Sequence, residues 1–150
     1  GVSGRGSIAR VCGLAQGGLA DLDLSRNPPV VTPVPLLRAD DCRAVLPLAA
    51  GGWAIASREQ EFPHVLVVAA DGTSRNITLN LQATFIEDLL ETPRGIAVAS
   101  DGYAFINAAS PAVRVEPSNA RFSEITTLAL WKGRLFVGGQ GASILQAPAP

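Results

Sequence analysis

Four stretches of this chain share one pattern, in which an apolar run, a turn containing glycine and a second apolar run follow one another. The clearest is PRGIAVASDGYAFIN (Pro93 to Asn107), where Asp101-Gly102 separates two apolar runs. An Asp-Gly turn between alternating runs is typical of a β-hairpin, because a type I′ turn needs positive φ at both central residues. The other three stretches are VCGLAQGGLADLDL (Val11 to Leu24), AVLPLAAGGWAIAS (Ala44 to Ser57) and TLALWKGRLFVGG (Thr127 to Gly139).

A single hairpin of this kind cannot bury both of its apolar faces, so repetition indicates that the copies pack on one another. Two further strand pairs follow the second and third stretches, over His64 to Leu79 and Ala112 to Ile125, which predicts a unit of four strands. The turn glycines Gly18, Gly52, Gly102 and Gly133 are 34, 50 and 31 residues apart. We attribute the long interval to loops at REQEFP (58–63) and QATFIEDLLE (82–91), the second containing one short helical turn at FIEDLL.

Composition favours short strands over helices and one domain over two. The chain has 150 residues, of which 47% are hydrophobic and 17% charged, with 15 Gly and 11 Pro. Such a chain can bury one substantial core, and the many turn formers fit strands joined by turns. We therefore expect a flexible tail over residues 1–9 and a single all-β domain over 10–150.

Charge and hydropathy exclude two classes of partner at the level of sequence. The formal net charge of −1 provides no basic field for nucleic acid or for an anionic lipid surface. Pro, Gly or charged residues interrupt each apolar run well before the roughly 20 residues that a membrane span needs. We therefore expect neither nucleic-acid binding nor a membrane span.

PRGIAVASDGYAFIN resembles the repeat of NHL-type and gluconolactonase-like β-propellers, in which Pro-x-Gly and an apolar strand lead to an Asp-Gly turn and another apolar strand. The match is closest over Pro93 to Asn107 and weaker over Ala44 to Leu79 and Thr127 to Leu145. The resemblance implies blades of four antiparallel strands stacked in a ring. At about 40 to 45 residues per blade the chain holds three to four, whereas rings have about 4 to 8. An incomplete ring is thus expected, and a compact β-sandwich is the alternative.

An incomplete ring predicts a function through the surfaces that it leaves uncovered. We expect a non-enzymatic interaction or scaffold module, completed by another protein chain or by the remainder of the same protein. The chain contains no Met and begins GVSGRGS, which indicates a processed product or a fragment. The alternative that the resemblance implies is part of a metal-dependent, lactonase-like hydrolase.

The sequence offers little support for that enzymatic alternative. In gluconolactonase-like propellers the Pro-x-Gly entry often carries an Asn that binds a divalent cation, but this chain has Arg94 there, whose charge would repel a cation. Asp71, Asp101 and Asn107 remain as oxygen donors, and Asp71 and Asp101 are explained by their Asp-Gly turns. His64 is the only histidine, and no Gly-x-Ser-x-Gly motif accompanies it. We therefore assign no catalytic residue, no metal ligand and no cofactor.

Aromatic and basic residues beside the predicted turns are the candidates for partner binding. Trp53, Tyr103 and Trp131, with Arg94, would form a rim of the kind that is common at protein interfaces. The alternative is that the aromatic residues pack between blades, since each blade needs bulky side chains.

The two cysteines, Cys12 and Cys42, lie near the first strands of neighbouring predicted blades. Their spacing matches neither a zinc site nor a Cys-x-x-Cys redox motif. A disulfide and two buried thiols both remain open, and a disulfide would favour a secreted or otherwise oxidising location.

Overall fold

A computed structural model describes residues 2–14, 18–35, 41–59, 62–79, 85–100, 103–106, 113–115, 124–140 and 145–147. The described residues form strands joined by turns, and they contain no helix. Sheet 1 comprises β1 (Val2–Arg5), β2 (Ile8–Leu14), β3 (Gly18–Asp23) and β4 (Val30–Val34). Sheet 2 comprises β5 (Asp41–Pro47), β6 (Trp53–Glu59), β7 (Phe62–Val68) and β8 (Ser74–Thr78). Sheet 3 comprises β9 (Asp88–Thr92), β10 (Gly95–Ala99), β11 (Tyr103–Ile106) and β12 (Val113–Val115). Sheet 4 comprises β13 (Glu124–Trp131), β14 (Arg134–Gln140) and β15 (Leu145–Ala147).

Each sheet is an antiparallel meander in which strands that follow one another in sequence are paired. Three sheets have four strands, and sheet 4 has three strands among the described residues. The β5–β6 turn depends on Gly52, which has φ +85°, because a Cβ there would lie 2.0 Å from the carbonyl oxygen of Val68. The prediction of an all-β chain built from four-stranded antiparallel sheets is confirmed.

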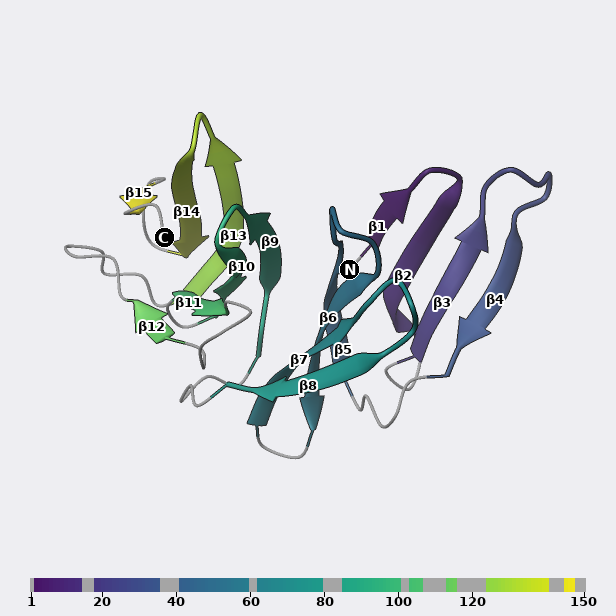
Figure 1. Cartoon of the computed structure of the whole chain (residues 1–150), viewed down its shortest axis with the longest axis horizontal. Helices are drawn as coiled ribbons and strands as arrows, with labels where there is room; N and C mark the ends of the chain where they lie inside the picture. Colours follow the sequence, from purple (N-terminus) through teal and green to yellow (C-terminus); the bar gives the residue numbers. More distant parts are fainter. Residues whose placement is uncertain are drawn as a thin grey trace.

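The sheets stack in sequence order and do not close into a ring. Strands β1, β2 and β3 contact β5, strands β5 and β6 contact β9, and strands β9 and β10 contact β13. Figure 1 shows the result as an arc, with sheet 1 at one end and sheet 4 at the other. This serial stacking of meanders is compatible with propeller-like blades, and the open arrangement is consistent with an incomplete ring or with a sandwich.

The core is divided into three clusters, one at each junction between successive sheets. The junction of sheets 2 and 3 holds the largest cluster, that of sheets 3 and 4 the second, and that of sheets 1 and 2 the third. Side chains alternate between neighbouring junctions, so that Ile96 and Val98 face sheet 2 while Ala97 and Ala99 face sheet 4. A strand buried on both faces has an almost continuous apolar sequence, which explains GIAVA in β10.

The four stretches that align on their turn glycines occupy different strands of their sheets. Val11 to Leu24 and Gly95 to Asn107 cover the second and third strands of their sheets, whereas the other two stretches cover the first and second. The second strands β2, β6, β10 and β14 begin at Ile8, Trp53, Gly95 and Arg134, at intervals of 45, 42 and 39 residues. The glycine spacing is irregular because Gly18 and Gly102 lie in the hairpins of the second and third strands of their sheets, whereas Gly52 and Gly133 lie in those of the first and second.

Two expectations about local structure are wrong. Residues 1–9 were expected as a tail, but Val2–Arg5 form β1, which pairs with β2 along four residues. The FIEDLL segment was expected to hold a helical turn within a loop, but Asp88–Thr92 form β9, the first strand of sheet 3. Its leucines explain why, since Leu89 packs in the junction with sheet 2 and Leu90 against the junction with sheet 4.

Candidate functional site

Trp53, at the start of β6, packs at the junction of sheets 1 and 2. Its ring adjoins the core cluster of that junction, and the Arg10 guanidinium lies 4.4 Å from the ring centroid. Arg10 also donates two hydrogen bonds to the Asp21 carboxylate, at 2.6 and 2.7 Å. These contacts hold Trp53 between the sheets as a packing residue.

Trp131, at the end of β13, lies in a different environment. Its side chain is 60% exposed, its ring meets Phe136 edge to face with centroids 6.4 Å apart, and the Lys132 Nζ lies 4.6 Å from its centroid. The structure thus places Trp53 and Trp131 on different sheets and in separate surroundings. Arg94 is exposed on the two-residue β9–β10 turn, and the side chain of Tyr103 lies outside the described residues.

Trp131 belongs to a face of sheet 4 that points away from sheet 3, which we call the outer face of sheet 4. The opposite face packs on sheet 3 through Leu128, Leu135 and Val137. Gly138 leaves space for the Thr127 side chain on the outer face, because a Cβ at position 138 would lie 2.9 Å from Thr127 Cγ2. This face has a hollow of about 440 Å³, lined by Thr127, Ala129, Trp131, Phe136, Val137 and Gly138.

Sheet 1, at the other end of the arc, also has a face that points away from its neighbour. Its inner face packs on sheet 2 through Cys12 and Leu19. The strand registers align two rows on the opposite face, which we call the outer face of sheet 1: Val2, Val11, Ala20 and Pro33, and Gly4, Ala9, Leu22 and Val31. None of these residues has a polar side chain. Val2 is 71% exposed and Val31 59% exposed, whereas Ala20 is buried.

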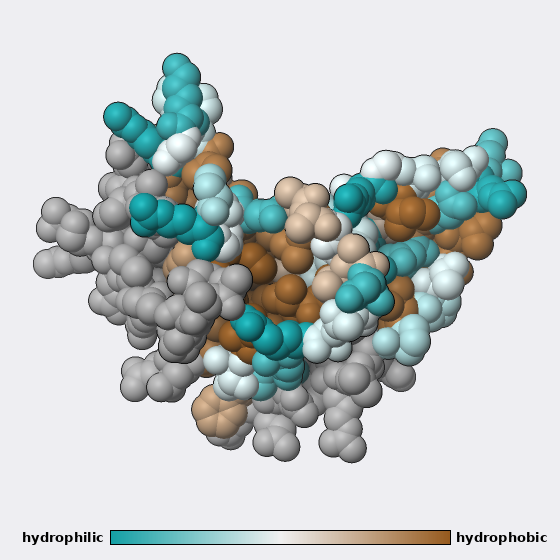
Figure 2. Space-filling model, in the orientation of Figure 1, coloured by the Kyte–Doolittle hydropathy of each residue, from teal (hydrophilic) through white to brown (hydrophobic). Residues whose placement is uncertain are grey.

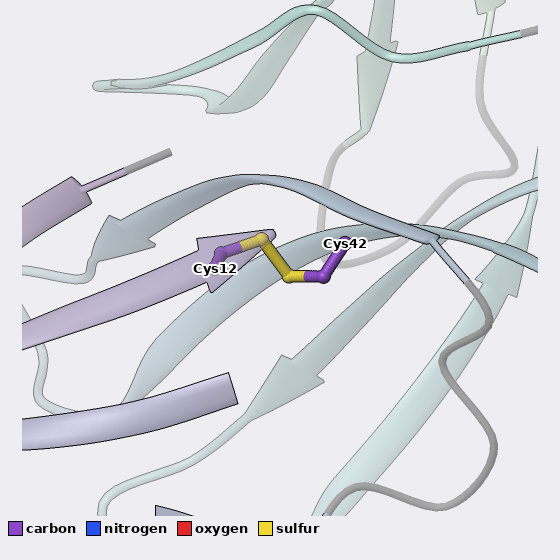
Figure 3. Close-up of a disulfide and its surroundings, with 2 residues drawn as sticks. All are labelled: Cys12 and Cys42. Atoms are coloured by element: carbon purple, nitrogen blue, oxygen red, sulfur yellow. A yellow bond between two sulfur atoms is a disulfide. The ribbon is translucent and has the colours of Figure 1, made fainter. Parts of the chain in front are cut away.

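A disulfide joins sheets 1 and 2. Figure 3 shows Cys12 on β2 bonded to Cys42 on β5, with Cα atoms 5.3 Å apart. Both cysteines are buried at this junction. Of the two states that the sequence left open, the structure contains the disulfide.

An apolar groove lies between sheets 2 and 3. It has a volume of about 390 Å³, and its apolar lining includes Val67, Ile77, Ile96 and Ile106. In Figure 2 hydrophobic residues gather in the middle of the view, between the two arms of the arc. Arg75 and Glu91 also line this groove, but the Glu91 Oε2 accepts a hydrogen bond from the Ala49 N–H at 2.7 Å.

Two of the polar residues considered for chemistry, His64 and Asp71, have structural partners. His64 is 8% exposed, and its Nδ1 lies 3.2 Å from the hydroxyl of Thr78, its neighbour across β7 and β8. Asp71 accepts hydrogen bonds from the Thr73 hydroxyl and N–H, which lower the pKa of its carboxyl. Asp101 and Asn107 lie outside the described residues. Within the described ranges, no three His, Cys, Asp or Glu residues are grouped so that they could hold a metal ion.

Asp88 is a half-buried carboxylate that the sequence did not single out. Its Oδ2 accepts a hydrogen bond from the Leu128 N–H at 2.8 Å, and its Oδ1 one from the Leu89 N–H at 2.8 Å. Burial raises the pKa of the Asp88 carboxyl, and the two hydrogen bonds oppose that shift. Asp88 therefore connects β9 to β13 and serves the junction of sheets 3 and 4. The only signal in the sequence is an acidic residue between apolar ones in FIEDLL.

The exposed faces and hollows described above are thus mainly apolar. The described part of the chain has no helix with the length and apolar character that crossing a lipid bilayer requires. Comparison of the chain with protein-family models, with curated proteins and with solved structures gave no match.

Proposed function

We propose that this chain is a non-enzymatic, β-propeller-type interaction module whose two outer faces are covered by protein. The observation that carries the proposal is the open stack, which leaves an apolar face of sheet 1 at one end and an apolar hollow on sheet 4 at the other. A blade in a ring has neighbours on both faces, so each outer face lacks a neighbour that the inner sheets possess. Large apolar surfaces of this kind mark interaction sites.

The strand spacing supports the propeller-type assignment. Second strands begin 45, 42 and 39 residues apart, close to the length of about 40 to 45 residues that four-stranded blades have. The resemblance of PRGIAVASDGYAFIN to NHL-type and gluconolactonase-like repeats points to the same architecture. Metal analysis of the purified protein separates this module from a lactonase-like enzyme, which would retain a divalent cation.

The test of the module is whether its outer faces are accessible in the dilute chain. We expect a dye that fluoresces on apolar surfaces to bind at dilutions where the wild type is monomeric, and Val31→Lys on the outer face of sheet 1 to reduce that binding. Val30→Lys is the matched control, because Val30 is adjacent on β4, is 51% exposed and lies on the opposite face. Equal dye binding by wild type and both variants would contradict the proposal.

A further inference from the structure

We propose that the protein covering the two outer faces is a second copy of this chain. The outer face of sheet 1 in each copy packs on the outer face of sheet 4 in the other, so that two arcs close one ring of eight sheets. This inference rests on the proposed function and names its partner.

The direction of stacking specifies which faces meet. At every junction one face of a sheet packs on the opposite face of the sheet before it in sequence, in the order 1, 2, 3, 4. Continuing this series beyond sheet 4 brings its outer face to the outer face of a sheet 1. Such a head-to-tail contact forms a closed ring when the rotation is completed, and two copies related by a two-fold axis complete it with eight sheets. Rings of about 4 to 8 blades are the usual range.

The two outer faces combine small and large residues as one existing junction does, although the small residues lie on the opposite partner. At the junction of sheets 3 and 4, the small residues Ala97 and Ala99 lie in one cluster with large residues of sheet 4, such as Leu135. The outer face of sheet 1 likewise has the small residues Gly4, Ala9 and Ala20 in its rows. The outer face of sheet 4 supplies the large side chains, Trp131 and Phe136, at its hollow.

The protruding side chains and the hollow are also complementary. Val2 and Val31 are exposed large hydrophobic residues on the outer face of sheet 1. The hollow of about 440 Å³ on sheet 4 is larger than two valine side chains, and most of its lining is apolar. Burial of these groups against each other removes apolar surface from water.

The area favours two contacts over one. Four strands spaced about 4.8 Å apart, each about five residues of about 3.3 Å, give a sheet face of roughly 300 Å². A single contact therefore covers roughly 600 Å² in total, which is the size of a crystal-packing contact. A closed pair of copies has two such contacts and roughly 1,200 Å², which reaches the range of stable interfaces.

Sedimentation equilibrium of the whole chain tests the inference. We expect the wild type to have twice the 15.5 kDa mass of one chain at micromolar concentration. Val31→Lys on sheet 1 and Ala129→Glu on sheet 4 should each abolish association. Each contact of the ring contains one sheet 1 and one sheet 4, so either variant alone buries an unpaired charge in both contacts. An equimolar mixture of the two should restore the dimer, since one of its contacts is then unmodified and the other places the introduced positive and negative charges on facing surfaces. Val30→Lys and Thr126→Glu are the matched controls, which are exposed on the same strands and should remain dimeric.

Each other outcome overturns the second copy as partner. A monomeric wild type does so, as do longer open oligomers, a dimer that both variants retain, or a dimer that depends on one face only. Circular dichroism of each variant establishes that loss of association is not loss of fold. The proposed function has a separate readout, which is dye binding. If the wild type is monomeric and Val31→Lys lowers its dye binding, the outer faces are accessible as proposed, and only the second copy as partner is refuted.

Discussion

At the scale of single residues, Asp88 shows how one carboxyl group can connect two sheets. Its carboxylate accepts the Leu128 N–H, which belongs to the neighbouring sheet 4. Glu87 and Glu91, on either side of Asp88, interact with sheet 2. Glu87 pairs with Arg43 of β5 at 3.1 Å, and Glu91 accepts a hydrogen bond from the Ala49 N–H in the β5–β6 turn. The acidic residues around β9 therefore connect sheet 3 to both of its neighbours.

The raised pKa of Asp88 predicts a pH dependence with a definite sign. Its carboxyl binds a proton more tightly in the folded chain than in the unfolded chain, where its ordinary pKa is 3.8. The free energy of unfolding therefore decreases as pH rises from 3.8 through the raised pKa. We expect the stability of wild type relative to Asp88→Asn to be greater at about pH 4 than at about pH 7, measured by urea denaturation.

Asp71 provides a control of opposite sign. Hydrogen bonds from Thr73 lower the pKa of the Asp71 carboxyl in the folded chain. Its contribution is present above 3.8 and is lost as pH falls toward the lowered pKa, so the advantage of wild type over Asp71→Asn should be greater at about pH 7. The same trend for both variants would contradict these assignments.

At the scale of elements, β9 separates what sequence patterns predict from what they miss. The hairpins of β5–β6, β10–β11 and β13–β14 were predictable because apolar alternation surrounds a turn that contains glycine. β9 was missed because Asp88 and Glu91 gave it the composition of a loop, although both have partners on other sheets. β1 was missed for a similar reason, since Gly4 and Gly6 made an edge strand look like a tail.

Replacement of Leu89 tests the assignment of β9 to the core. Leu89 is 5% exposed at the junction of sheets 2 and 3. Leu89→Ala should lower the free energy of unfolding by about 2 to 5 kcal/mol, as large-to-small core substitutions do. Leu24→Ala, at a leucine that is 54% exposed, is the control and should change it by less than about 1 kcal/mol. Equal effects, measured by chemical denaturation, would place Leu89 outside the core.

The disulfide between β2 and β5 is the covalent connection of sheets 1 and 2. It closes a loop between cysteines 30 residues apart, which restricts the unfolded chain. Removing it by the double variant Cys12→Ala, Cys42→Ala should lower the free energy of unfolding by about 3 kcal/mol. Reductant should destabilise the wild type and leave the double variant unchanged in the same urea titration. A wild type that is insensitive to reductant while unfolding would contradict a stabilising disulfide.

At the scale of the whole molecule, the structure is a series of sheets in which each contacts the next. The all-β character was predictable from the apolar hairpins of the sequence, because each hairpin needs a neighbour to cover it. The candidate site was less predictable: Trp53 and Trp131 look alike in sequence, but one lies under Arg10 and the other on the outer face of sheet 4. Sequence cannot separate them because the difference depends on which face of its sheet each ring lies on and on whether another sheet packs on that face.

Serial stacking predicts that a local defect lowers the stability of its own sheet and of the adjacent sheet more than that of distant sheets. Leu135 is fully buried at the junction of sheets 3 and 4, so Leu135→Ala should open sheet 4 and loosen β9 and β10. In a chain of nearest-neighbour contacts the effect decays with distance along the stack. Amide hydrogen exchange should therefore accelerate most in β13 and β14, less in β9 and β10, and least in β2 and β3.

The oligomeric state changes this expectation in a way that hydrogen exchange can detect. In the Val31→Lys background, which we expect to be monomeric, sheet 1 is the most distant sheet from the defect and its exchange should be unchanged. In the closed pair of copies, the outer face of sheet 1 packs on sheet 4 of the partner, so Leu135→Ala should accelerate exchange in β2 and β3 as well. Uniform acceleration of all strands in the monomeric background would instead show one cooperative unit and contradict the serial description.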